Sequence, residues 1–239
     1  MGNFVFCISI IFVGLLATNS SGEVEAQSFD RLTFHAKPKP LAEGAVVTDW
    51  PRFLGPLDNA TSPETPLLQE WPPGGPTKLW EVAMGEGYNS PSILGDRCVI
   101  FHAIDGRETV ECLDRESGKR FWVFDYPIEY QDRYGFSNGP RASPVISADG
   151  VVVTAGVTSM LHALELATGK VLWEIDLRER YNVPQDFFGA GSSPLILDGR
   201  VIVNVGGKAS PFDESDSRKE RAAKLATKGA CVVAFALKT

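Results

Sequence analysis

Short apolar runs alternate with turn-forming residues along most of the chain, a pattern that predicts β-strands joined by hairpins. Three serine–proline pairs each open such a run, and their prolines lie 53 and 50 residues apart. A turn of glycine and aspartate follows each run, and a second apolar run follows each turn, as tight hairpins require. The pairs are Ser90-Pro91, Ser143-Pro144 and Ser193-Pro194, and the second runs are Cys98–Phe101, Val151–Thr154 and Val201–Val205. The chain therefore repeats one hairpin three times.

A second signature closes each repeat. It combines an alternating strand, a Ser/Thr-Gly-Lys turn and a tryptophan strand, and its complete copies occupy residues 112–122 and 163–173. A third copy begins at Ala234 and reaches Thr239, where the glycine would come next. Each period of about 50 residues therefore contains four predicted strands, which is the pattern of a β-propeller blade.

One tryptophan and one glycine recur at fixed places in this signature. A blade cannot bury both faces of its own sheet, so neighbouring blades must cover them. We expect the indole rings to be wedged between adjacent blades, where each buries up to ~250 Å². Glycine permits the backbone conformation that the turn needs. The predicted structural residues of the repeat are Trp80, Trp122, Trp173, Gly118 and Gly169.

The signature resembles the tryptophan-docking repeat of the PQQ-like, or quinoprotein-type, β-propeller family over about residues 76–239. Residues 49–56, Asp-Trp-Pro-Arg-Phe-Leu-Gly-Pro, are similar to the opening segment of bacterial members. The resemblance implies an all-β fold, a partial β-propeller with four-stranded antiparallel blades and about three blade repeats of a larger ring. The architecture is similar to that of outer-membrane-protein assembly factor propellers.

The number of repeats predicts an incomplete ring. Propellers have about 4–8 blades, whereas this chain has three repeats, the third without its tryptophan strand. Lys78–Val82 looks like a tryptophan strand with no blade before it, and in propellers such a strand completes the last blade. We therefore expect residues 77–239 to be propeller repeats truncated at the C-terminus. The alternative is a short protein whose copies assemble into one ring.

The N-terminus predicts export. Phe4–Leu16 is almost wholly apolar and about 13 residues long, which is too short to cross a membrane but suits a signal peptide. Val24-Glu25-Ala26 offers a small-residue cleavage site before Gln27. Residues 1–26 are therefore predicted to be a signal peptide, and the protein to be periplasmic or secreted. No lysine or arginine precedes the apolar run, so an uncleaved segment in contact with the membrane is the alternative.

Two further segments lie outside the repeats. Residues 27–76 are polar and rich in proline, and we predict that they form a flexible tether and an extended lead-in. The third repeat carries an insertion near residues 206–229, where Ser215 or Asp216 would begin a short helix. This helix either lies in solvent or docks a partner.

Charge and cysteine content narrow the range of partners. The formal net charge is −7, which disfavours nucleic acid because phosphate groups repel an acidic chain. Cys98, Cys112 and Cys231 form no paired motif, and we expect them to be small buried apolar residues. A Cys98–Cys112 bridge across one hairpin is the alternative.

The loops before the serine–proline strands are the predicted ligand face, because they share one side of the ring with the insertion. Arg141 is the candidate for an anionic ligand, since a guanidinium group pairs bidentately with carboxylates. The alternative is that these loop residues only close and solvate the loops. The loops span residues 85–89, 134–142 and 186–192, and the candidate binding residues are Tyr88, Asn138, Arg141 and Phe187.

The sequence offers no recognisable catalytic centre. Gly135–Gly139 matches a nucleophile-elbow pattern, but it lacks the strand before and the helix after that the elbow needs. The three histidines are isolated from one another, so no metal site is predicted. The family resemblance implies PQQ over a calcium ion in the dehydrogenases, yet no adjacent cysteine pair or calcium ligand set can be assigned here. No cofactor is therefore predicted.

These observations favour an extracytoplasmic, non-catalytic binding or interaction scaffold, with a protein or small-molecule ligand on the propeller face. The alternative is a fragment of a PQQ-dependent quinoprotein dehydrogenase that oxidises alcohols or sugars with PQQ and calcium. A sensor domain that binds small ligands is a third hypothesis.

Overall fold

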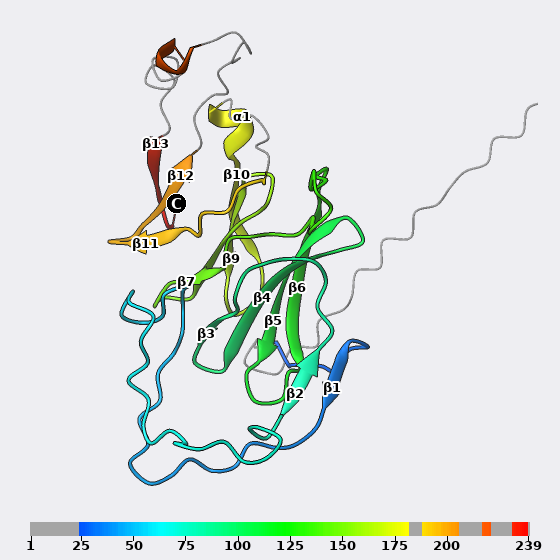
Figure 1. Ribbon diagram of the computed structural model, residues 1–239, viewed down its shortest axis with the longest axis vertical. Helices are drawn as coiled ribbons and strands as arrows, with labels where there is room; N and C mark the ends of the chain where they lie inside the picture. Colours follow the sequence, from blue (N-terminus) through cyan, green and yellow to red (C-terminus); the bar gives the residue numbers. More distant parts are fainter. Residues whose placement is uncertain (1–23, 182–187, 206–216, 221–230, 239) are drawn as a thin grey trace, which may run out of the picture.

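The computed structural model describes residues 24–181, 188–205, 217–220 and 231–238, which are almost entirely strands and loops (Figure 1). Three antiparallel sheets follow one another along the chain. The first contains β3 (Ser92–Leu94), β4 (Arg97–Ile104), β5 (Arg107–Asp114) and β6 (Arg120–Pro127). The second contains β7 (Val145–Ile146), β8 (Val151–Ala155), β9 (Met160–Glu165) and β10 (Val171–Asp176). The third contains β11 (Leu195–Leu197), β12 (Arg200–Val205) and β13 (Cys231–Ala236).

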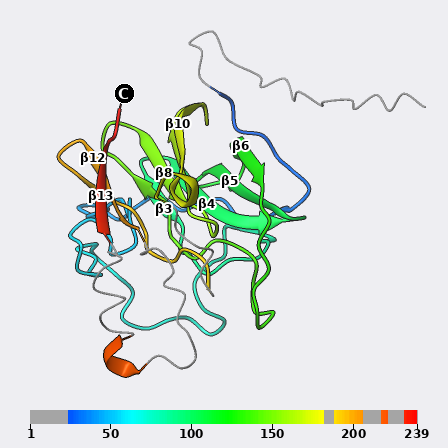
Figure 2. The same cartoon turned by 90° about the horizontal axis from the view of Figure 1, so that it is seen from above.

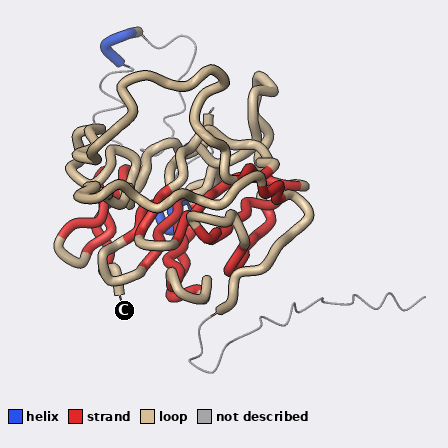
Figure 3. The backbone as a smooth tube through the Cα atoms, turned by 90° about the horizontal axis from the view of Figure 1, so that it is seen from below, coloured by secondary structure: helices blue, strands red, loops and turns tan. Residues whose placement is uncertain are grey.

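The prediction of an all-β chain is confirmed, and so is the prediction of four-stranded antiparallel sheets. Neighbours in each sheet are also neighbours in sequence, an arrangement that is consistent with the blades of a partial propeller. The second sheet lies between the other two, with β5 and β6 on one side of it and β12 and β13 on the other (Figure 2). The short α1 (Leu177–Tyr181) follows β10. Figure 3 shows long connecting loops lying on one side of the strands.

The repeat tryptophans join each sheet to the next. Trp122 on β6 is only 2% exposed and lies in a core shared by the first two sheets, with Val99 of β4 and Leu164 of β9. Its indole N–H donates to the carbonyl oxygen of Leu166 at 2.8 Å. The other two tryptophans bond to the same position of the repeat, Trp80 to Arg115 at 3.0 Å and Trp173 to Leu237 at 2.9 Å. Each indole thus fills an apolar gap and satisfies a loop carbonyl.

The repeat glycines make room for these rings. A Cβ atom built on Gly169 would lie 2.6 Å from Cδ2 of Trp122, and one built on Gly118 would lie 2.6 Å from Cδ2 of Trp80. Both glycines also have positive φ, 75° and 70°, which other residues rarely adopt. The turn therefore needs glycine for its conformation and for the close approach of the indole.

A line of serines joins the first strands of the three repeats. The Ser143 hydroxyl oxygen accepts the backbone N–H of Ser90 at 3.0 Å, and the Ser193 hydroxyl oxygen accepts that of Ser143 at 2.9 Å. The proline that follows each serine donates no backbone N–H of its own. The same serine-to-serine hydrogen bond therefore recurs once per repeat where the sheets come together.

Part of the segment predicted to be a flexible tether packs against the first sheet instead. Gln27 exchanges two backbone hydrogen bonds with Arg120, each 2.8 Å long. Five residues later, β1 (Leu32–Phe34) pairs antiparallel with β2 (Trp80–Val82). Between them Arg31 reaches the buried carboxylate of Glu111. Backbone pairing and a buried ion pair therefore hold residues that look like a polar linker in the sequence.

Cys98 and Cys112 are free and buried, so the alternative of a bridge between them is not realised. Burial raises the pKa of the Cys98 thiol to about 11 and raises that of Cys112 further. Both residues therefore serve as small apolar side chains in the core.

The predicted start of the inserted helix, Ser215 or Asp216, lies outside the described residues. The described turn at residues 218–220 is helical. The Ser217 hydroxyl donates to the Glu220 carboxylate at 2.6 Å and accepts the Glu220 backbone N–H at 3.3 Å, which is a reciprocal N-terminal cap. None of the helices in the described part of the chain has the length and apolar character needed to span a membrane.

Candidate functional site

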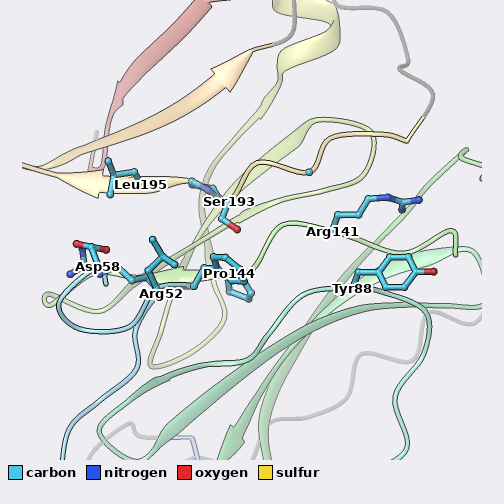
Figure 4. Close-up of a pocket in the computed structure, with 11 residues that line it drawn as sticks. Arg52, Asp58, Tyr88, Arg141, Pro144, Ser193 and Leu195 are labelled. Carbon is cyan, nitrogen blue, oxygen red and sulfur yellow. The ribbon is translucent and has the colours of Figure 1, made fainter. Parts of the chain in front are cut away.

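A cleft of about 410 Å³ opens where the first strands of the three repeats come together. Tyr88 and Arg141 lie on one side of it, and Arg52, Asp58 and Leu195 lie on the other (Figure 4). Pro144 and Ser193, from two of the serine–proline pairs, lie between them. The cleft therefore brings together two of the four predicted binding residues with a part of the chain that lies before the repeats.

The lead-in reaches the cleft by pairing with the edges of two sheets. Trp50 exchanges backbone hydrogen bonds with Ile93 of β3, 3.0 and 2.8 Å long, and the carbonyl oxygen of Pro51 accepts the N–H of Ile146 in β7 at 2.8 Å. The next residue, Arg52, forms an ion pair with Asp58 at 2.9 Å. Residues 50–58 thus close one wall of the cleft, which the sequence resemblance for residues 49–56 did not predict.

Arg141 is already bonded to its own loop. Its guanidinium group lies 2.8 Å from the Asp132 carboxylate and 3.0 Å from the carbonyl oxygen of Ser137, and it also donates to the carbonyl oxygen of Gly139. The Asp132 side chain is 2% exposed and that of Arg141 is 13% exposed. An anionic ligand would therefore have to compete with a buried carboxylate for this arginine.

The other predicted residues have different positions. The Asn138 side-chain oxygen accepts the backbone N–H of Asp132 at 2.8 Å, and its backbone N–H donates to Glu86, so it links loops of two repeats. Tyr88 is 62% exposed at the mouth of the cleft. Phe187 lies outside the described residues. Residues 135–139, the elbow-like match, form loop and not a strand-to-helix turn.

Three aromatic side chains that the sequence analysis did not select gather on the loops before the second and third serine–proline strands, and we call them the aromatic rim. They are Tyr134, Phe136 and Phe188, which are 59%, 71% and 55% exposed. The Tyr134 ring centroid lies 5.9 Å from that of Phe136 and 6.2 Å from that of Phe188. The sequence did contain a signal for these side chains. They are aromatic residues next to Gly135 and Gly189, in the loops predicted to form the ligand face.

A buried polar cluster lies between the first two sheets. The Glu108 carboxylate accepts the Tyr126 hydroxyl at 2.6 Å and the backbone N–H of Val157 at 2.7 Å. Burial raises the pKa of Glu108, although both hydrogen bonds and the charge of Arg141 oppose that shift. His162 packs on Tyr126 with ring centroids 4.3 Å apart, and its Nδ1 atom has no hydrogen-bond partner among the described residues. Burial lowers the pKa of His162 to about 4.

We predict that His162 makes the fold sensitive to mild acid. An unfolded chain would bind a proton at His162 near pH 6.5, whereas the folded chain binds it only near pH 4, so stability falls as the pH drops between these values. The largest loss is about 3 kcal/mol. In His162→Phe, which keeps a ring beside Tyr126 but cannot titrate, urea denaturation at pH 7 and pH 4.5 should give a smaller difference than in the wild type. An equal difference in both proteins would refute the prediction.

The described residues do not fit the calcium ion that accompanies PQQ in dehydrogenases of the resembling family. Calcium requires about 6–8 oxygen ligands, several of them carboxylates. Asp58, which lines the cleft, is paired with Arg52, and the buried Asp132 is paired with Arg141. Over the part of the chain that is described, no three His, Cys, Asp or Glu side chains come close enough together to hold a metal ion.

Comparison with known proteins gives two kinds of relative. A family model described as outer membrane protein assembly factor BamB matches residues 106–221. The chain is 25% identical over 146 residues to BamB of Yersinia pestis, and this match covers 59% of this chain and 35% of that protein. It is 24% identical over 154 residues to 1-butanol dehydrogenase (cytochrome c) of Thauera butanivorans, covering 63% of this chain and 22% of that protein. The chain therefore spans about a third or less of each relative.

Solved structures of both kinds resemble the chain. BamB from Moraxella catarrhalis has a TM-score of 0.37 and 19% identity, covering 52% of this chain and 35% of that one. A quinohemoprotein alcohol dehydrogenase from Comamonas testosteroni has a TM-score of 0.38 and 21% identity, covering 52% of this chain and 17% of that one.

Proposed function

We propose that this chain is a non-catalytic scaffold that binds another protein. The premise is that it carries PQQ-like β-propeller repeats homologous to those of BamB and of quinoprotein dehydrogenases. The binding surface is the aromatic rim together with the mouth of the cleft. The protein acts outside the cytoplasm, as part of a larger ring.

The aromatic rim is the observation that carries this proposal. Its three side chains are each more than half exposed and lie against one another, and a contiguous apolar patch in water is characteristic of protein interaction sites. Aromatic residues also dominate the binding energy of protein interfaces, because a rigid ring buries much area at little entropic cost. Tyr88, 62% exposed at the cleft, adds a fourth ring to the same group of loops.

The proposal also assigns a role to each part of the chain. Residues 1–26 contain the export signal, residues 27–76 lead into the repeats, and residues 77–239 form part of the propeller. The Yersinia pestis relative is, by its name, an assembly factor for outer membrane proteins, which supports a protein partner in the cell envelope.

The alternative, a fragment of a PQQ-dependent dehydrogenase, is supported by the similarity to 1-butanol dehydrogenase (cytochrome c). An assay of dye-linked alcohol oxidation by the full-length protein with added PQQ and Ca²⁺ separates the two functions. We expect no turnover. Turnover that depends on PQQ would reject the scaffold proposal.

Site-specific photo-crosslinking tests the rim directly. A photoreactive phenylalanine analogue in place of Phe136 should capture a protein in intact cells, because this side chain is 71% exposed, the most of the three in the aromatic rim. The same analogue in place of Trp71, which is 65% exposed in the lead-in, is the matched control and should capture little. Once a partner is captured, Phe136→Ala should weaken its binding by about 30-fold, corresponding to the ~2 kcal/mol of an interface hot spot. Equal capture at both positions would contradict the proposal.

A further inference from the structure

The packing of Val24 bears on where the exported protein is processed. We infer that signal peptidase hydrolyses the peptide bond between Gly22 and Glu23, and not the bond after Ala26. Water is added across the bond, which leaves a carboxylate on Gly22 and a free amino group on Glu23. The inference rests on the exported state that the proposed function assumes.

Val24 is part of the hydrophobic core. It is 6% exposed and belongs to the cluster of buried residues between the first two sheets, which also contains Phe121 and Trp122 of β6. Ala26 packs against the same cluster. Cleavage after Ala26 would remove both side chains and leave that part of the core open to water. A signal peptide that is discarded has no reason to contribute core residues.

The residues that follow hold Val24 in place. Gln27 forms two backbone hydrogen bonds with Arg120 at the edge of β6. Phe29 lies between two guanidinium groups, 5.2 Å from that of Arg31 and 4.6 Å from that of Arg120. Arg31 is fixed in turn by the buried Glu111 carboxylate, 2.5 Å away. Residues 24–31 thus form one continuous docked segment.

Cleavage after Ala26 would also place the end of the chain at a paired residue. The backbone N–H of Gln27, which donates to the carbonyl oxygen of Arg120 at 2.8 Å, would become part of a charged amino terminus. With cleavage before Glu23, the new amino group would be four residues earlier in the chain, and this backbone pair would be unchanged.

The sequence supplies a suitable site before Val24. Signal peptidase requires small residues one and three positions before the bond that it cleaves. Ser20 and Gly22 meet this requirement for the Gly22–Glu23 bond, as Val24 and Ala26 do for the bond before Gln27. Both bonds are therefore chemically acceptable, and the burial of Val24 favours the earlier one.

The experiment is to export the full-length chain, isolate the envelope fraction, and determine the mature N-terminus by intact mass and Edman sequencing. We expect the mature protein to begin at Glu23. Two matched variants place a large residue directly before each candidate bond. Gly22→Gln should accumulate precursor or shift cleavage to the bond before Gln27, whereas Ala26→Gln should be processed before Glu23 as efficiently as the wild type. Because precursor accumulation does not require a folded product, neither result depends on the stability of the variant.

The contrary outcomes are distinct. A mature wild-type chain that begins at Gln27, or precursor accumulation in Ala26→Gln alone, would overturn the inference and leave export intact. An exported chain that still begins at Met1 would overturn both the cleavage site and the predicted signal peptide. Retention of the chain in the cytoplasm would overturn the extracytoplasmic function itself, and the cell fraction, not the mass, reports it.

Discussion

Replacing Trp122 by alanine is expected to lower the free energy of unfolding by about 3–5 kcal/mol, the usual cost of removing a large buried aromatic side chain. The ring is 2% exposed between the first two sheets, and its N–H satisfies the carbonyl oxygen of Leu166. The substitution therefore creates a cavity and leaves a loop carbonyl without its donor. Urea denaturation followed by tryptophan fluorescence and circular dichroism measures the loss.

A pair of glycine variants separates the indole contact from the backbone effect. Gly169→Ala and Gly199→Ala both place a Cβ on a residue with positive φ, 75° and 68°, which costs about 1–2 kcal/mol in each case. Of these two positions, only Gly169 would bring the new atom against an indole, at 2.6 Å, whereas no atom of the described residues lies within 4 Å at Gly199. Gly169→Ala should therefore lose a further ~1–3 kcal/mol through overpacking. Equal losses in the two variants would show that the close contact with Trp122 contributes nothing.

Glu111→Gln is expected to destabilise the protein by about 3 kcal/mol at pH 7. The Glu111 side chain is fully buried, and it accepts hydrogen bonds from Arg31 at 2.5 Å, Arg120 at 2.7 Å and His102 at 3.0 Å. Nδ1 of His102 accepts the N–H of Gly85, so Nε2 is the nitrogen that donates to the carboxylate. A neutral amide would leave two guanidinium groups without their counter-ion, and breaking a buried ion pair in this way typically costs ~3–5 kcal/mol.

The same carboxylate predicts a loss of stability in strong acid. Burial alone would raise the pKa of Glu111, but the hydrogen bonds from His102, Arg31 and Arg120 outweigh it and lower the pKa to about 2. In the unfolded chain this carboxyl binds a proton near pH 4.5. The stabilisation that ionised Glu111 contributes to the folded protein is therefore complete above that pH and disappears as the pH falls toward 2. The gap in unfolding free energy between wild type and Glu111→Gln should therefore narrow from pH 5 to pH 2.5.

Glu81→Gln is the matched control for this experiment. Glu81 is also a strand carboxylate with a basic and a histidine partner, Lys78 and His35, but its side chain is 50% exposed. Because water screens such pairs, the variant should unfold at nearly the same urea concentration as the wild type. A gap for Glu111→Gln that stays constant with pH would mean that the pKa of this carboxylate is the same in the folded and the unfolded protein.

The repeat made the sheets predictable. Ser90, Ser143 and Ser193 mark the start of each unit in the sequence and form serine-to-serine hydrogen bonds in the structure. A sequence repeat of this kind predicts where strands form and also which sheets are neighbours, because every repeat must pack on the next copy of itself. The positions of β3 to β13 therefore follow from spacing and turn chemistry alone.

Contacts that occur only once in the chain could not be predicted in this way. Arg31 and Glu111 are 80 residues apart, and Trp50 pairs with Ile93 without any periodic signal. The candidate site is built from such contacts, since the lead-in closes the cleft and Asp132 satisfies Arg141. Exposure of the aromatic rim likewise depends on how loops of two repeats come together. Sequence spacing places these loops along the chain but does not show which of their side chains are buried.

The indole hydrogen bonds all run in one direction along the chain. Each repeat tryptophan donates to a carbonyl further toward the C-terminus, 35, 44 and 64 residues ahead for Trp80, Trp122 and Trp173. If the chain crosses the membrane with its amino end first, as the proposed export requires, a sheet cannot be sealed until most of the following one has emerged. Folding would then lag behind translocation by about one repeat, and during that interval the most recently emerged tryptophan is exposed.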